Sequence, residues 1–107
     1  MAEIPRPLLR HRVDVEPRLG TSPRGDVYGD PVTVRCLVEE RRRQVRADDG
    51  AELVAEATLR ARLADAAVLG VGARVTLPTG RTTWVLDVRR HDDAALGAWQ
   101  HCEVMLA

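Results

Sequence analysis

The chain has 107 residues, of which 45% are hydrophobic, and its 16 basic and 16 acidic residues give a formal net charge of zero. This length suits one domain with a modest core, so we expect a single domain over residues 1–107. The balanced charge excludes the positive excess of a dedicated nucleic-acid-binding protein. No stretch approaches the roughly 20 apolar residues of a membrane helix, and the N-terminus lacks an apolar run of signal-peptide length. We therefore expect a protein made in a cytoplasm, with no membrane partner.

The first predicted element is a strand over Leu8 to Glu16, where apolar and charged residues alternate. Residues 17–30 then combine prolines and glycines that interrupt both helix and sheet, which predicts a long exposed loop. From Pro31 to Glu39 alternation returns with β-branched residues, which predicts a second strand. The residues expected to face the core are Leu9, His11, Val13 and Val15 in the first strand, and Val32, Val34, Cys36 and Val38 in the second.

Residues 39–50, EERRRQVRADDG, form an almost wholly charged segment that ends in a turn signal. We expect a charged loop that projects into solvent or toward a partner. Guanidinium groups bind phosphates and carboxylates in bidentate fashion. Two readings therefore stay open: a solvated loop partly neutralised by Glu39 and Glu40, or a contact with a phosphate backbone or an acidic subunit. The arginines concerned are Arg41, Arg42, Arg43 and Arg46.

The second half of the chain predicts further short strands. Residues 51–65 suit either helix or strand, and we favour a strand over Glu52 to Ala61. A short strand over Ala73 to Leu77 and a Pro-Thr-Gly turn precede RTTWVLDVRR, which predicts a hairpin with Trp84, Leu86 and Val88 facing together. A last strand is expected over Trp99 to Leu106. Together these elements predict an all-β fold, mainly antiparallel, that forms a small barrel or sandwich of five to six strands with long loops, with or without one short helix.

Two histidines, two aspartates and a cysteine fall near the end of the chain, over residues 91–102. In a strand His101 and Cys102 point to opposite sides, so they cannot converge on one zinc ion. Cys36 and Cys102 lie among Val and Leu residues, which favours two reduced core thiols. We expect no catalytic, cofactor or metal site. A metallohydrolase using His91, His101 and Asp93 is the enzymatic alternative.

From Leu8 to Leu106 the order of features resembles the head-to-tail stopper, or head-closure, proteins of long-tailed bacteriophages, in the form found in actinobacterial phages and related prophages. The resemblance is carried by Asp26 with Tyr28-Gly29-Asp30-Pro31, and by a G-x-R-V-x-L to V-L-x-V hairpin from Gly72 to Val88. The stretch from Ala61 to Gly72 departs from the family because it lacks the prolines usual before the hairpin.

The resemblance implies a structural virion protein of the neck, without enzymatic activity, that forms a homo-oligomeric ring of six or twelve subunits. Its partners would be the portal-adaptor protein above, the tail terminator or tail tube protein below, and packaged double-stranded DNA in the lumen. By position, residues 39–50 would be the loop directed into the lumen, which places Arg41, Arg42, Arg43 and Arg46 against DNA phosphates. Subunit contacts would use outward apolar residues, for which we name Leu37, Val54, Val85 and Trp99.

The alternative to a virion component is a small free-standing β-barrel adaptor that binds a peptide or a nucleic acid through one sheet face. Neither reading requires a cofactor.

Overall fold

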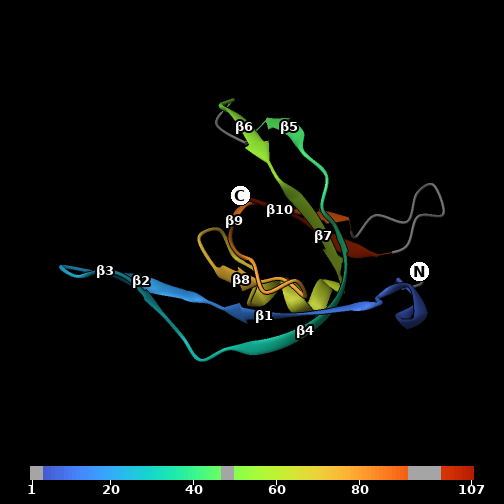
Figure 1. Cartoon of the computed structure of the whole chain (residues 1–107), viewed down its shortest axis with the longest axis horizontal. Helices are drawn as coiled ribbons and strands as arrows, with labels where there is room; N and C mark the ends of the chain where they lie inside the picture. Colours follow the sequence, from blue (N-terminus) through green and yellow to red (C-terminus); the bar gives the residue numbers. More distant parts are fainter. Residues whose placement is uncertain (1–3, 47–49, 92–99) are drawn as a thin grey trace.

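A computed structural model describes residues 4–46, 50–91 and 100–107. In these residues six antiparallel strands form a closed barrel (Figure 1) in the order β1-β4-β7-β10-β9-β8. The small all-β barrel expected from the sequence is therefore confirmed. The strands of the barrel are β1 (His11–Glu16), β4 (Val32–Glu39), β7 (Ala57–Ala61), β8 (Arg74–Thr76), β9 (Thr82–His91) and β10 (His101–Leu106).

The interior of the barrel is filled mainly by Val, Leu, Ala and Cys side chains, because the alternating residues of each strand point inward. The predicted inward faces are confirmed for Val13, Val15, Val34 and Cys36, which are all buried. Val32 was also expected to face the core, but it is 42% exposed at the start of β4. A 3-10 helix, η2 (Leu63–Ala67), follows β7 and forms part of the packing around this core. A second short 3-10 helix, η1 (Arg6–Leu8), precedes β1. No helix in the described ranges is both long and apolar enough to cross a membrane.

Two hairpins project from the barrel (Figure 1), in segments expected to be loops. Residues 17–30 contain β2 (Arg18–Ser22) paired with β3 (Gly25–Tyr28). Residues 39–50 contain β5 (Arg43–Arg46), which pairs with β6 (Glu52–Ala55). The loop predictions were wrong because a two-stranded arm in solvent needs no apolar alternation. Its cross-strand pairing and its turn residues are sufficient.

The turn of the first hairpin explains how its prolines and glycines fit a strand pair. Pro23 lies in the turn rather than in a strand, where its missing N–H costs nothing. The Ser22 hydroxyl accepts a hydrogen bond from the Arg24 N–H at 3.2 Å and donates one to the Gly25 carbonyl at 3.1 Å. Gly25 adopts a φ of 110°, which side chains disfavour. The residues that suggested a loop therefore build a tight reversal.

The strand expected over residues 52–61 is confirmed, although it is divided at Glu56 into β6 and β7. The hairpin of β8 and β9 is confirmed as well, with Arg74 paired with Trp84. The predicted faces of β9 were wrong: Val85 is 2% exposed and lies in the core, whereas Trp84 is 44% exposed. The reason is a register shift between β9 and β10, which leaves Leu86 as an extra residue. This bulge allows Val85 and Val88 to face the same side.

The two cysteines are free and buried. Both are register partners of Ala61, one on each side of β7. Two strand spacings separate them by roughly 9–10 Å, beyond the Cα separation of about 7 Å that a disulfide tolerates. Burial raises the pKa of the Cys36 thiol to about 12 and also raises the pKa of Cys102. The two core thiols expected from the sequence are therefore present and protonated.

We expect both thiols to resist alkylation near neutral pH in the folded protein and to react rapidly after unfolding. Because the pKa of Cys36 rises from 9.0 to about 12 on folding, its contribution to stability is complete below pH 9.0 and is lost as the pH rises toward 12. The chain contains no lysine, so few other side chains titrate in this window. Thermal melts of the wild type and Cys36→Ala should therefore converge with rising pH. Rapid labelling of the native protein would contradict this prediction.

Candidate functional site

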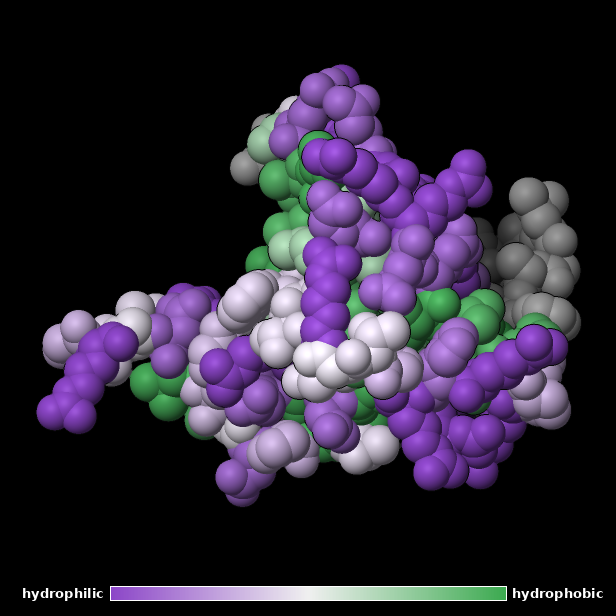
Figure 2. Space-filling model, viewed as in Figure 1, coloured by the Kyte–Doolittle hydropathy of each residue, from purple (hydrophilic) through white to green (hydrophobic). Residues whose placement is uncertain are grey.

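The β5–β6 hairpin is the most prominent charged feature of the molecule. It projects from the barrel where β4 ends and β7 begins (Figure 1), and hydrophilic residues cover much of its surface (Figure 2). All four arginines singled out in the sequence lie on it or at its base, and all are exposed: Arg41, Arg42, Arg43 and Arg46. The turn residues 47–49 lie outside the described residues.

The arginines of this arm differ in how far they are neutralised. Arg42 lies 3.5 Å from a carboxylate oxygen of Glu56, and Arg46 lies 3.7 Å from one of Glu52. Within the described ranges, Arg41 and Arg43 form no ion pair. Exposed ion pairs of this kind contribute little to stability and exchange readily for other partners. Arg41 and Arg43 are therefore open to an incoming anion, on an arm that also carries Glu39, Glu40, Glu52 and Glu56.

The base of the β5–β6 arm is fixed to the outer surface of the barrel. Ala55 and Met105 are fully buried there and pack with Leu86 in a second, smaller apolar cluster. Asp87 is also buried, and it is the register partner of Met105 on β10. One of its carboxylate oxygens lies 3.6 Å from Arg89 Nε. Arg89 in turn donates a hydrogen bond to the Arg46 carbonyl at 3.0 Å. These contacts set the direction in which the arm points.

The base of the β2–β3 arm is held by aromatic and ionic contacts. Trp84 Nε1 donates a hydrogen bond to the Tyr28 hydroxyl at 3.2 Å, and the Arg74 guanidinium stacks 4.4 Å from the Tyr28 ring centroid. Arg74 also binds both carboxylate oxygens of Glu16, at 2.7 and 3.0 Å. This hydrogen-bonded pair lowers the pKa of Glu16 and raises that of Arg74. Tyr28 was noted in the sequence only as part of a motif, and its anchoring role follows from the fold.

The outer part of the β2–β3 arm exposes apolar side chains. Leu19 is 68% exposed and Val27 is 41% exposed. Exposed apolar side chains on a projecting strand pair are available for contact with a partner. Sequence reasoning missed this surface because residues 17–30 were expected to be a loop.

The four residues proposed for subunit contacts have different positions. Val54 is 42% exposed on the β5–β6 arm, and Leu37 is half-buried on β4. Val85 faces the core and is not available for an interface, which corrects that part of the expectation. Trp99 lies outside the described residues.

The closing histidines form a cross-strand pair. His91 and His101 are register partners on β9 and β10, and their rings stack with centroids 4.7 Å apart at an interplanar angle of 17°. Over residues 4–46, 50–91 and 100–107, no three His, Cys, Asp or Glu side chains gather as metal ligands. Asp93, the third residue of the enzymatic alternative, lies outside the described residues. His91 and His101 therefore form a stacked contact between the imidazole rings of two neighbouring strands.

No protein-family model matches the chain, and no curated protein matches its sequence.

Proposed function

We propose that this chain is a structural subunit of the head-tail connector of a long-tailed bacteriophage, acting as a stopper that forms a ring and helps to retain the packaged genome. The observation that supports this proposal best is the arginine-bearing β5–β6 hairpin, which projects from a closed barrel on a fixed base. A projecting arm that bears arginines suits a lumen filled by DNA. The barrel provides the rigid wall.

The strand pairing favours assembly through arms. Each strand of the barrel has neighbours on both sides, so extending the sheet into a second subunit is disfavoured. A ring with cyclic symmetry requires two different complementary patches on each subunit. The exposed Leu19 and Val27 of the β2–β3 arm supply one apolar patch that could lie against the next barrel. In a ring of six or twelve copies, a weak contact per subunit is multiplied.

The expected partners follow from this arrangement. They are other copies of the chain, a portal-adaptor protein on one side, a tail terminator or tail tube protein on the other, and double-stranded DNA in the bore. The protein would be located in the virion neck. Arginines supplied by every subunit would neutralise phosphates at the end of the genome.

The proposal is tested by assembly on a purified portal-adaptor complex, followed by electron microscopy and mass measurement. We expect the wild type to add a ring, and Leu19→Asp to lose it because a charge enters the apolar arm. Val71→Asp is the matched control, since Val71 is also exposed, at 62%, but lies outside both arms. A protein that never joins the complex, or that binds a peptide or nucleic acid only as a monomer, would contradict the proposal and favour a free-standing adaptor.

A further inference from the structure

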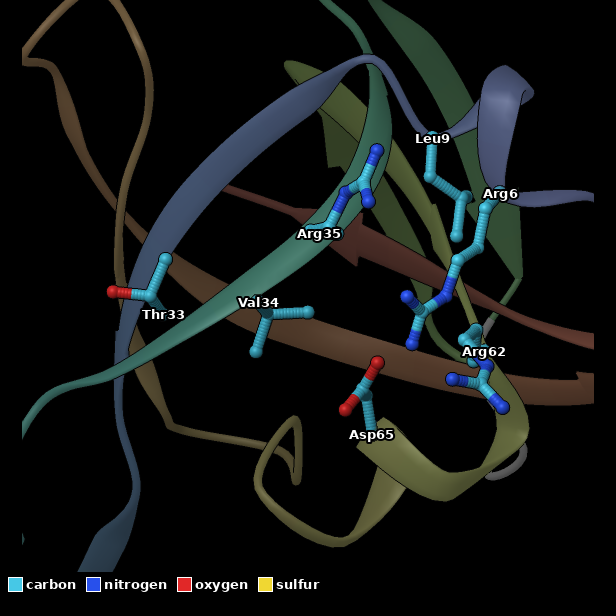
Figure 3. A pocket seen from close by; sticks show the side chains of 7 residues that line it. All are labelled: Arg6, Leu9, Thr33, Val34, Arg35, Arg62 and Asp65. Atoms are coloured by element: carbon cyan, nitrogen blue, oxygen red, sulfur yellow. The ribbon is translucent and has the colours of Figure 1, made fainter.

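A pocket of about 200 Å³ lies beside the first half of β4, away from both arms. Figure 3 shows Arg6 reaching from η1 toward Asp65 of η2, with Arg62 at the start of η2 and with the Arg35 side chain on β4 pointing away from Asp65. The floor is apolar, with Leu9 and Val34 both buried. We call the group formed by Arg6, Arg35, Arg62 and Asp65 the arginine pocket.

The pocket exists because β4 is longer than the strand beside it. β4 pairs with β1 from Val32 to Cys36, but its pairing with β7 begins only at Cys36, opposite Ala61. Beyond Ala61 the chain leaves the sheet and enters η2. The flank of β4 before Cys36 is therefore left open on the β7 side. The helices η1 and η2 bring Arg6 and Asp65 to this gap.

The charge in this region is unbalanced. Three guanidinium groups line the pocket together with one carboxylate. Arg35 is also directly opposite Arg12 on β1. Like charges on facing positions of neighbouring strands destabilise a sheet. Among the described residues, neither Arg6 nor Arg35 forms an ion pair. Local conflicts of this kind are expected at functional or strained sites.

We propose that the arginine pocket binds a phosphate group, either of free phosphate or of a DNA backbone. A tetrahedral oxyanion offers several acceptor oxygens, which suits guanidinium groups that come from three different elements. The pocket, at about 200 Å³, has room for one phosphate group. A bound anion would also relieve the repulsion between Arg12 and Arg35, which are register partners. The proposal does not depend on ring formation.

The test is a titration of the purified protein with inorganic phosphate at constant ionic strength, followed by calorimetry and by NMR of the arginine Nε–H groups. We expect saturable binding and shifts of the Arg6 and Arg35 signals. Arg6→Ala and Arg35→Ala should each weaken binding about tenfold, the effect of losing a charge-assisted hydrogen bond. Arg81→Ala is the matched control, because Arg81 is exposed near the β8–β9 turn and loses the same charge. Asp65→Asn should tighten binding, since it removes a negative charge from the pocket.

A second arm of the experiment distinguishes the two sources of phosphate. A short DNA duplex that competes with inorganic phosphate, and that loses affinity in Arg6→Ala, supports a backbone phosphate as the natural ligand. Binding of inorganic phosphate without such competition supports a free phosphate. The proposal is overturned if phosphate does not bind saturably, or if Arg81→Ala weakens binding as much as the pocket variants. Circular dichroism of each variant verifies that it remains folded.

Discussion

Replacing Leu59 with alanine is expected to lower the free energy of unfolding by about 2–5 kcal/mol. Leu59 is fully buried on β7, and it pairs with Val38 on one side and Val104 on the other. The surrounding strands are hydrogen-bonded around a closed ring, so they can move little to fill the cavity left by the missing atoms. A domain of this size has a total stability of about 5–15 kcal/mol, so the loss would be a large fraction of it.

Denaturant unfolding followed by circular dichroism measures this effect. Leu19→Ala is the matched control, because it makes the same chemical change at a side chain that is 68% exposed on the β2–β3 arm. We expect the control to differ from the wild type by no more than about 0.5 kcal/mol. Equal losses in the two variants would mean that the barrel interior is not the main source of stability.

Charge reversal of Arg41, Arg42 and Arg43 to glutamate is expected to leave the fold intact and to weaken genome retention severely. The fold should persist because all three side chains are exposed. Among the described residues the ion pair lost is that between Arg42 and Glu56, which is itself exposed. Retention should fail because each subunit would exchange three phosphate-attracting groups for three that repel phosphate. A ring of identical subunits would multiply this change.

Particles assembled with the variant test this expectation, by counting DNA-filled heads in electron micrographs and by measuring released DNA. Arg81→Glu is a control for charge reversal outside the arm. Thermal melting of the isolated variant separates loss of folding from loss of function. Normally filled heads in a folded variant would remove the β5–β6 arm from the proposed role in retention.

The barrel itself follows from local patterns in the sequence. Alternation in residues 8–16 and 31–39 predicts which side chains enter the core, because a strand places neighbouring residues on opposite faces. The same rule failed in β9, where the bulge at Leu86 reverses the faces, and a bulge depends on the partner strand. A single strand read alone cannot reveal it.

The candidate sites were predictable only in part. The exposure of the four arginines followed from their charge. The β2–β3 arm could not be predicted in this way, because its strands are held by their pairing with each other and by contacts of Tyr28 with Trp84 and Arg74. Both of these residues are distant from Tyr28 in the sequence. The arginine pocket is likewise assembled from η1, β4 and the segment after β7, and no spacing in the sequence brings Arg6 near Asp65.

Closure of the barrel also has a consequence for how quickly the chain folds. The ring is completed where Val15 meets Val75, and β10 must be inserted between β7 and β9. Pairings between such distant positions become favourable only after a large loss of chain entropy, which slows folding. The hairpins β2–β3, β5–β6 and β8–β9 can form early from neighbouring residues, so we expect sealing of the ring to be the rate-limiting event and refolding to take milliseconds to seconds.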